Sequence, residues 1–416
     1  MAKINPADAE AARLMEIQRA AAPKSRRGDI GLIVVCAVLI LAFGVGIYCI
    51  PHRDFSEVEN TTLQTFPRAS SSGKFLDQVW NGKFMAALKE FYTDQFPFRD
   101  QMVAAKAGVE LALGKGENNA VILGKDGYLI KRIEYSEDEL DKLRANLAAV
   151  SDFRVTVGKP VTFALAPRAI DVLGTYLPGI CSADRAEAVW KIVDTYADGS
   201  FGDQPTLLSL REVLEPLADA GEPVWYRTDH HWTTLGAYHA YAALGELCGY
   251  MPAAQDSFIQ ELAAADFLGT TYSASGFYWV DGEEMYFWRY PGDETYTVEI
   301  LANDEVIQTL KGFYDRSYLE KKDKYAAFLS SNNAHMRVSN GEDKPTLLLI
   351  KDSFAHSVVP FLAQHYTLEI LDLRYYRKTV ASFLETHEVD RILILCGLDS
   401  LATSDLLTAL PVGMGE

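Results

Sequence analysis

The sequence predicts an α/β fold in which a mostly parallel sheet lies between layers of helices. Beyond residue 118, short segments rich in aliphatic and β-branched residues alternate with segments that suit helices. Two of the short segments, TLLLI (346–350) and RILIL (391–395), are almost continuously apolar, which is typical of strands covered on both faces. The chain of 416 residues, 49% of them hydrophobic, is long enough to form a sizeable core.

Five segments are predicted strands of this sheet: VTFALAP (161–167), PVWYRTD (223–229), TLLLIKD (346–352), YTLEILDLR (366–374) and RILILCGL (391–398). Segments 235–248 and 358–364 suit the helices that cover it. Residues 278–310 differ, because aromatic residues and turn signals predict antiparallel strands there, inserted into the larger domain.

A long apolar segment lies near the N-terminus. It reads IGLIVVCAVLILAFGVGIYCI from Ile30 to Ile50 and contains no charged residue, so as a helix it can cross a hydrocarbon layer of roughly 30 Å. Basic residues at positions 19, 24, 26 and 27 precede it, which predicts a cytoplasmic N-terminus and an extracytoplasmic remainder. A cleaved signal peptide is the main alternative, but no A-x-A site follows the segment. We therefore expect a single-pass cell-membrane protein.

The whole chain divides into four predicted parts. A cytoplasmic tail over 1–28, with a short helix over 5–22, precedes an anchor over 29–50. A helical stalk and entry region follows over 51–118, with helices near 75–92 and 101–113. The remainder, 119–416, is the predicted catalytic domain.

Charge and cysteine content exclude some classes of protein. A net charge of −18 argues against a nucleic-acid partner, since binding phosphates needs a concentrated basic face. The five cysteines include no C-x-x-C pair, so they predict neither a structural zinc site nor a disulfide framework. A single bridge between Cys181 and Cys248 stays open.

Ser353 is the first candidate for chemistry. It follows the predicted strand 346–352 at the turn into a helical segment, where its hydroxyl can be exposed above the sheet edge. Backbone N–H groups at such a turn can stabilise an oxyanion. The alternative is that Ser353 simply caps the following helix, a role that serine favours.

A nucleophilic serine needs a general base, and Asp229–x–His231 supplies one with an orienting carboxylate. If residues 225–231 are extended, Asp229 and His231 point to one face and His230 to the other. Two alternatives compete with this hypothesis. Asp, His and His could all ligate a metal ion, although adjacent histidines on a strand diverge. Thr228 or Asp229 could also cap the helix predicted after them.

The block TDHHWTTLGAYHAY (228–241), together with KDSFAHS (351–357), resembles the DHHW family of bacterial envelope proteins. That family is similar to the SGNH-hydrolase-like alginate and peptidoglycan O-acetyltransferases, and the resemblance implies a three-layer α/β sandwich. Further segments that match it are FSEVEN (55–60), FYTDQFPFRD (91–100), LGKDGYLI (123–130), FLGTTY (267–272), DKYAAFLSSNNAH (323–335) and LDLRYY (371–376). In the related acetyltransferases an Asp-x-His motif precedes the nucleophilic serine, which implies a triad of Asp229, His231 and Ser353.

Other polar residues are candidates for substrate or oxyanion binding. An amide of Asn332 or Asn333 could donate to an oxyanion, although SSNN also suits a loop turn. Arg374 could bind a carboxylate or the oxyanion, or form an ion pair at the end of its strand. Tyr272 and Trp232 could line a sugar-binding surface or pack in the core, and His230 could position substrate.

The resemblance implies O-acetyl transfer to a cell-wall or exopolysaccharide hydroxyl through a serine acyl-enzyme, with no metal or dissociable cofactor. It also implies that a multi-spanning membrane-bound O-acyltransferase supplies the acetyl group from the cytoplasm. A carbohydrate acetylesterase would use the same triad with water as the acceptor. A non-catalytic polysaccharide-binding scaffold is the alternative from a different class.

Overall fold

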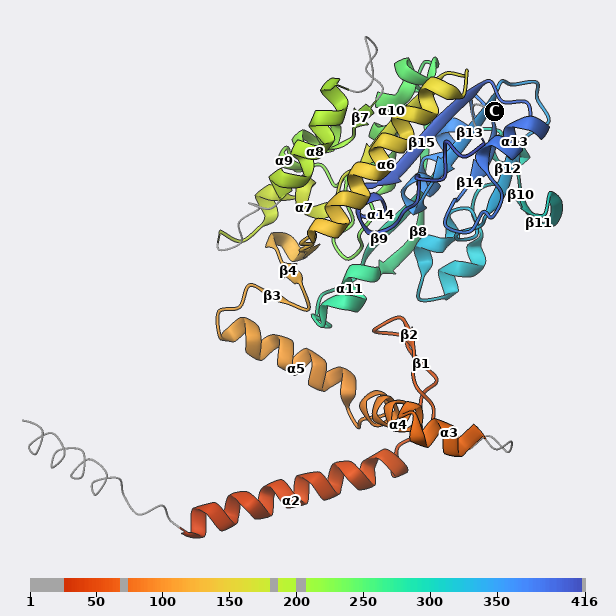
Figure 1. Ribbon diagram of the computed structural model, residues 1–416. Coiled ribbons are helices and arrows are strands. Elements are labelled where there is room, and N and C mark those ends of the chain that lie inside the picture. The colour runs from red at the N-terminus through yellow and green to blue at the C-terminus, as the bar shows by residue number, and fades with distance from the viewer. Residues whose placement is uncertain (1–25, 68–73, 180–185, 200–206, 414–416) are drawn as a thin grey trace, which may run out of the picture. The chain divides into compact units, whose positions relative to one another are not determined.

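The computed structural model describes residues 26–67, 74–179, 186–199 and 207–413 (Figure 1). The helix predicted over 5–22 lies outside these ranges. Cys181 does too, so the Cys181–Cys248 bridge stays an open question. Contacts between residues divide the chain into two compact units. One comprises Met1–Ser56 and Thr61–Arg99, and the other comprises Glu57–Asn60 and Asp100–Glu416.

The smaller unit contains the apolar helix α2 (Arg26–Cys49). Within it, Gly28–Cys49 is long and apolar enough to cross a membrane, and almost none of that stretch is buried. A helix of this kind near the N-terminus serves either as a membrane span or as a signal sequence. The unit also contains β1 (Phe55–Ser56), β2 (Thr61–Thr62), α3 (Lys74–Trp80) and α4 (Lys83–Asp94).

The main segment of the larger unit begins at Asp100, within α5 (Arg99–Ala112). The unit therefore includes residues that precede the domain boundary predicted at residue 118. The reason is a small apolar cluster in which Ala107 of α5 packs with Val121 and Leu129. The latter two belong to a three-stranded antiparallel sheet made of β3 (Glu117–Asn118), β4 (Val121–Leu123) and β5 (Leu129–Lys131).

An eight-stranded sheet forms the centre of the larger unit, in the order β11-β10-β12-β14-β13-β15-β6-β7. Its strands are β6 (Val161–Ala166), β7 (Leu207–Ser209), β10 (Thr297–Ala302), β11 (Glu305–Lys311), β12 (His335–Ser339), β13 (Thr346–Lys351), β14 (Thr367–Leu371) and β15 (Arg391–Gly397). The pairs from β14 to β7 are parallel, and those from β11 to β14 are antiparallel. The predicted α/β fold with a mostly parallel sheet is confirmed.

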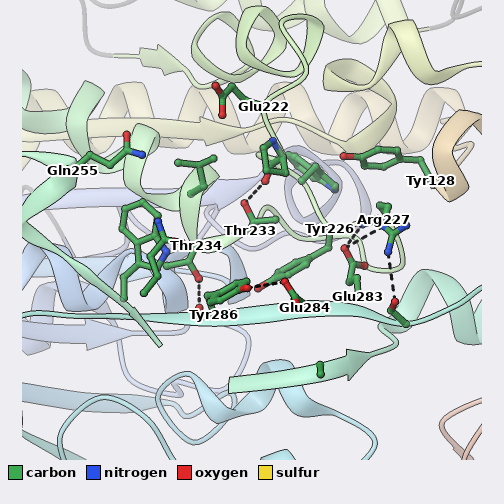
Figure 2. Close-up of a pocket in the computed structure, with 17 residues that line it drawn as sticks. Tyr128, Glu222, Tyr226, Arg227, Thr233, Thr234, Gln255, Glu283, Glu284 and Tyr286 are labelled. Atoms are coloured by element: carbon green, nitrogen blue, oxygen red, sulfur yellow. Dashed lines mark hydrogen bonds and ion pairs between the residues drawn. The ribbon is translucent and has the colours of Figure 1, made fainter. Parts of the chain in front are cut away.

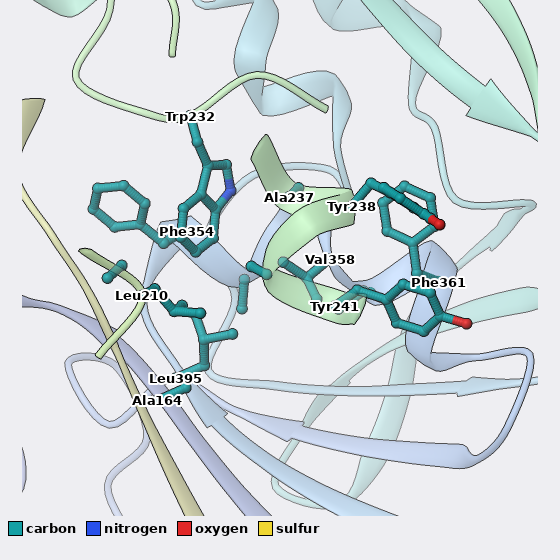
Figure 3. Packing of buried hydrophobic residues seen from close by; sticks show 14 of the residues in the cluster. Ala164, Leu210, Trp232, Ala237, Tyr238, Tyr241, Phe354, Val358, Phe361 and Leu395 are labelled. Atoms are coloured by element: carbon teal, nitrogen blue, oxygen red, sulfur yellow. The ribbon is translucent and has the colours of Figure 1, made fainter. Parts of the chain in front are cut away.

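Helices cover both faces of this sheet, as the near-continuous apolar strands predict. In β13, Leu347 and Leu349 belong to one apolar cluster, whereas Leu348 and Ile350 belong to the other. The first cluster includes residues of α9 (Arg211–Asp219), α10 (Thr234–Cys248) and α12 (Val359–Leu362). The second includes residues of α6 (Glu137–Thr156), α8 (Ala186–Gly199), α13 (Val380–Thr386) and α14 (Leu398–Thr403). Figure 3 shows the first cluster, in which Trp232 and Phe354 lie beside one another.

The antiparallel insertion predicted over 278–310 is divided between two sheets. β9 (Glu283–Arg289) pairs with β8 (Ile259–Phe267) in a separate two-stranded sheet. β10 and β11 instead extend the edge of the central sheet, because β10 pairs with β12. Two further short helices are α7 (Ala169–Val172) and α11 (Thr270–Ser275). Turns of 3₁₀ helix span Lys125–Gly127, Gly174–Tyr176, Gln255–Ser257, Asp293–Thr295, Arg316–Glu320, Lys324–Ala327 and Ser353–Ser357.

Candidate active site

Ser353 lies where the central sheet meets the following helical turn. β13 ends at Lys351, and Asp352, not Ser353, is the N-cap of the turn that begins at Ser353. The Asp352 carboxylate accepts from Phe354 N–H (3.0 Å), and it also accepts from Gly397 N–H (2.7 Å) and Ser400 Oγ (2.6 Å). The capping alternative for Ser353 is therefore wrong, and its hydroxyl is available for other contacts.

The strand predicted over 223–229 is wrong. Its only ladder contact is an isolated bridge between Trp225 and Trp232, and residues 227–231 form a bend. Asp229 causes the bend, because its Oδ1 accepts the backbone N–H of His231 (3.0 Å), a contact typical of aspartate turns. Tyr226 N–H closes the loop by donating to the carbonyl of His231 (3.2 Å). We call residues 226–231 the histidine loop.

The histidine loop places its second imidazole beside Ser353. His231 Nε2 lies 2.8 Å from Ser353 Oγ, and His231 Nδ1 lies 2.6 Å from Asp229 Oδ1. Because an ionised carboxylate only accepts, Nδ1 carries the proton of the imidazole and Nε2 is left to accept from the serine hydroxyl. His231 and Asp229 are buried, whereas Ser353 is partly exposed. The three predicted triad residues thus form one hydrogen-bonded chain.

Asp229 is held from its other side by the turn that begins α11. Its Oδ2 accepts from Thr270 N–H (2.7 Å) and Thr270 Oγ1 (2.9 Å). Gly269 is required there, since a Cβ at that position would lie 2.2 Å from Asp229 Oδ2. Burial alone raises the pKa of the Asp229 carboxyl, but His230, His231 and the Thr270 donor outweigh it and hold the pKa below its ordinary value. Sequence reasoning did not find Thr270, although Gly-Thr in FLGTTY was a signal.

Tyr325 is a second residue that sequence reasoning missed. Its ring stacks on that of His231, with centroids 3.9 Å apart and planes inclined by 6°. Its hydroxyl lies 3.3 Å from Ser357 Oγ and 3.4 Å from the carbonyl of Ser353. Tyr325 therefore contacts both the base and the nucleophile's turn.

His230 does not point away from the site, contrary to the strand-based prediction. Its ring centroid lies 3.8 Å from that of His231, because the histidine loop is bent and not extended. His230 Nδ1 lies 2.5 Å from Thr270 Oγ1. Reduced solvation and the nearby His231 ring lower the pKa of His230, although 43% of the side chain remains exposed. A neutral imidazole thus lies beside the triad.

A pocket of about 360 Å³ opens over Ser353. Polar residues that line it include Lys131, Arg168, His230, Thr270, Asp399 and Arg374. Arg168 is buried and paired with Asp171 (2.6 Å). The pocket gives a ligand direct access to the hydroxyl that His231 contacts.

Arg374 reaches this pocket from the end of β14. Its Nε and Nη2 donate to Asp372 (2.8 and 2.6 Å), and Nη2 also donates to Asn332 Oδ1 (3.1 Å). Asp372 is also paired with the buried Lys351 (3.3 Å), and burial lowers the pKa of that lysine. The ion pair proposed as the alternative for Arg374 is present, and it fixes the guanidinium at the pocket wall.

The remaining candidates lie outside the pocket. Asn333 Nδ2 donates to the carbonyl of Ser330 (3.1 Å) within its own loop, which matches the turn alternative. Trp232 and Tyr272 are both buried in apolar clusters, which matches the packing alternative given for them. Trp232 Nε1 donates to Ser357 Oγ (3.0 Å), and Tyr272 donates to the carbonyl of Tyr278 (3.2 Å). The cap of α10 is Thr233, not Thr228 or Asp229.

The metal alternative requires the same residues. Ligand atoms of Asp229, His230 and His231 lie within 4.8 Å of one another, so the histidines converge instead of diverging. Both oxygens of Asp229 already accept hydrogen bonds, however, and His231 Nε2 contacts Ser353. An ion would have to displace these bonds, so the donor set suits the triad better than a metal.

Two protein families match parts of the chain. The family described as "DHHW protein" matches residues 213–370, which include the histidine loop and Ser353. The family described as "SGNH hydrolase-like domain, acetyltransferase AlgX" matches residues 121–274. Over these two ranges the chain is similar to the DHHW family and to an SGNH hydrolase-like domain.

Curated relatives of this chain include two named "Probable alginate O-acetylase AlgJ". The one from Pseudomonas putida is 26% identical over 189 residues, which cover 44% of this chain and 47% of the relative. The one from Pseudomonas syringae is 28% identical over 194 residues, with the same coverage. The chain thus spans about half the length of the curated relatives it matches.

Two solved structures share the fold of this chain. A DHHW family protein from Eubacterium siraeum has a TM-score of 0.55 and 19% identity, over 70% of this chain and 95% of that one. Bacillus cereus PatB1 with a sulfonyl adduct has a TM-score of 0.56 and 20% identity, over 70% of this chain and 99% of that one. The larger unit is therefore SGNH-like in fold. The relationship to proteins named as probable alginate O-acetylases rests on the sequence matches given above.

Proposed function

We propose that this protein moves an acetyl group, through a Ser353 acyl-enzyme, to a hydroxyl of a cell-wall polysaccharide or exopolysaccharide. The observation that carries the proposal is the unbroken chain from Asp229 through His231 to Ser353 at an open pocket. Homology to proteins named as alginate O-acetylases supports acetyl as the group transferred.

The hydrogen-bonded residues supply a base for each proton transfer. His231 Nε2 takes the proton of Ser353 while Oγ attacks the carbonyl carbon of an acetyl ester or thioester. The imidazolium then protonates the leaving alcohol or thiol, and an acetyl-enzyme remains. In the second half, the sugar hydroxyl gives its proton to His231 and attacks the same carbon, which releases the acetylated sugar and restores Ser353. Asp229 stabilises the imidazolium in both halves.

Oxyanion stabilisation comes from fewer backbone donors than the sequence suggested. Phe354 N–H already donates to Asp352 and is therefore committed. Among the described residues, Ser353 N–H has no hydrogen-bond partner, and Arg374 Nη1 has none either. We assign binding of the oxyanion to these two donors. The first is the backbone N–H of the nucleophile's own residue, and the second belongs to a side chain in the pocket wall.

His230 contributes an acceptor to the same pocket. Thr270 has one hydroxyl proton, which is better donated to the Asp229 carboxylate than to an imidazole, because charge-assisted hydrogen bonds are stronger. Thr270 Oγ1 then accepts from His230 Nδ1–H, so that the lone pair of His230 lies on Nε2. An acceptor sugar hydroxyl can donate to that atom. We therefore assign His230 to positioning the acceptor.

We infer the location from α2. Basic residues at positions 19, 24, 26 and 27 precede or begin this helix, and the rest of it carries none, so α2 suits a retained anchor with the N-terminus in the cytoplasm. The catalytic site would then face away from cytoplasmic acetyl donors. A multi-spanning membrane-bound acyltransferase is the partner we propose to deliver the acetyl group.

One experiment separates the three classes of function. The full-length protein in detergent is treated with a serine-directed fluorophosphonate, and the modified peptide is located by mass spectrometry. We expect modification at Ser353 that is absent in Ser353→Ala and unchanged in Ser317→Ala, an exposed serine outside the pocket. Acetyl transfer from an activated acetyl ester to a short glycan is then compared with release of free acetate. Release of acetate alone would identify an esterase. If Ser353 in folded protein does not react, the non-catalytic scaffold is the remaining alternative.

A further inference from the structure

A second pocket, of about 660 Å³, shares the histidine loop with the pocket over Ser353 (Figure 2). Tyr226 and Arg227 of the loop line the second pocket, whereas His230 lines the first. The volume falls in the range of roughly 300–1,000 Å³ that is usual for small-molecule sites. Nothing in the acyl-transfer mechanism requires a second pocket of this size.

The lining of this pocket combines buried aromatic residues with exposed polar residues. Trp225 and Trp288 are buried behind it, and Tyr286 is half-buried at its side. Gln260 and Glu284 are exposed at its mouth, on the paired strands β8 and β9. A sugar ring presents an apolar C–H face together with an edge of hydroxyl groups, so a saccharide matches both kinds of lining.

The charges in the pocket restrict the kind of saccharide. Three carboxylates line it, from Glu222, Glu283 and Glu284, whereas Arg227 is the one cation of the lining. Arg227 lies 3.9 Å from Glu283 and is thus partly neutralised. A ligand that carries carboxylates would be repelled here, whereas hydroxyl or ammonium groups could donate to the carboxylates of Glu222 and Glu284, of which Glu284 also accepts from the Tyr286 hydroxyl (2.6 Å).

Glu283 joins this pocket to the catalytic residues. Its carboxylate accepts from the backbone N–H groups of Arg227 (2.9 Å) and Thr228 (2.7 Å) and from Thr228 Oγ1 (2.6 Å). Asp229 follows Thr228 directly, so the wall of the second pocket holds the base of the histidine loop. A chain of sugars bound here would lie against the same loop that carries His230 and His231.

We propose that this pocket is a binding site for neutral or amino-sugar residues of the acceptor polymer, and that it discriminates against uronates. The assignment to the acceptor rests on the proposed function, but binding itself does not depend on catalysis.

The test is calorimetric titration of full-length Ser353→Ala protein in detergent with three tetrasaccharides of equal length. They are a tetramer of N-acetylglucosamine, a tetramer of glucosamine and a tetramer of mannuronate. We expect binding of at least one of the first two, and little binding of the third. Gln260→Ala should weaken binding by about tenfold, and Glu284→Lys should weaken binding of the glucosamine tetramer while improving that of the mannuronate tetramer.

Matched control substitutions are Gln308→Ala and Glu305→Lys, which change exposed residues on β11 outside the pocket. Preferential binding of mannuronate, binding of no tetramer, or equal effects of pocket and control substitutions would each overturn the proposal. Fluorophosphonate labelling of Ser353 in the unmodified chain is measured alongside. Saccharide binding by a protein whose Ser353 does not react would reject acyl transfer and support the saccharide site. Labelling of Ser353 without saccharide binding would support acyl transfer and reject the saccharide site.

Discussion

The ring of Tyr325 lies parallel to the ring of His231, with the two centroids 3.9 Å apart. The His230 ring is also close, with its centroid 3.8 Å from that of His231. The proposed base therefore contacts two rings while its nitrogens contact Asp229 and Ser353. Since an imidazole can rotate about its side-chain bonds, the stacked Tyr325 ring restricts the rotation that would break these two hydrogen bonds.

The first prediction concerns Tyr325. Tyr325→Phe keeps the stacked ring and loses only the two long hydroxyl contacts, with Ser357 Oγ and the Ser353 carbonyl, so acetyl transfer should fall by less than about tenfold. Tyr325→Leu removes the flat surface beside His231 and should lower kcat by about a hundredfold or more in folded protein. Rates of Ser353 labelling by the fluorophosphonate, with thermal unfolding as the folding control, provide the measurement. Equal activity of the two variants would show that stacking does not position the base.

The second prediction concerns the carboxylate. Asp229→Asn should keep the fold yet lower kcat on the order of 10⁴-fold, by analogy with serine proteases, because the amide favours the wrong imidazole tautomer. His231→Ala and Ser353→Ala should lose about as much activity as the double variant, since triad members act as a unit. Steady-state transfer to a short glycan checks this, with circular dichroism to confirm folding. Additive losses would contradict a shared mechanism.

The third prediction separates His230 from His231. His230→Phe retains a ring against His231 but removes the Nε2 acceptor, so acylation of Ser353 should continue while KM for the glycan rises by about tenfold. Thr270→Val should act in the same direction and should also slow acylation, because Thr270 additionally holds Asp229. The burst amplitude measures acylation of Ser353, and the KM for the glycan measures binding of the acceptor, so the two half-reactions are followed separately. Loss of acylation in folded His230→Phe would assign the base role to His230.

The fourth prediction is a pH dependence of stability. The pKa of Asp229 is lower in the folded protein than the unfolded value of about 3.9. The ionised carboxylate therefore contributes stability that is fully present above pH 4 and is lost as the pH falls through the folded-state pKa. The free energy of urea unfolding should decrease less steeply below pH 4 in Asp229→Asn than in the unmodified protein. Parallel curves would show that Asp229 gains no stabilisation from its contacts.

The fifth prediction concerns membrane topology. An impermeant thiol reagent applied to intact cells should label an engineered Glu305→Cys but not Ala9→Cys. The unmodified chain, whose Cys36 and Cys49 lie in α2, serves as the background control. Labelling at position 9 alone would reverse the orientation. Recovery of a chain that begins after residue 50 would show that α2 is a cleaved signal sequence.

Local patterns predicted much of this protein. The apolar strands 346–350 and 391–395 need cover on both faces wherever they occur, so the parallel sheet could be predicted from them. Because a strand that enters a helical turn leaves its last residues at the sheet edge, the position of Ser353 could be predicted too. The charge-free run of α2 is equally a property of sequence alone.

Only the tertiary structure decided what surrounds those residues. His231 and Ser353 are 122 positions apart, and Thr270 reaches Asp229 from 41 positions away, so no local period relates them. The prediction for His230 failed because side-chain alternation applies to a paired strand, whereas the Asp229 side chain bends residues 227–231 into a loop. Asp352, and not Ser353, caps the turn because Gly397 at the end of β15 and Ser400 after it also donate to the Asp352 carboxylate. Residue types and their spacing determined which groups were available, and long-range packing determined which of them meet.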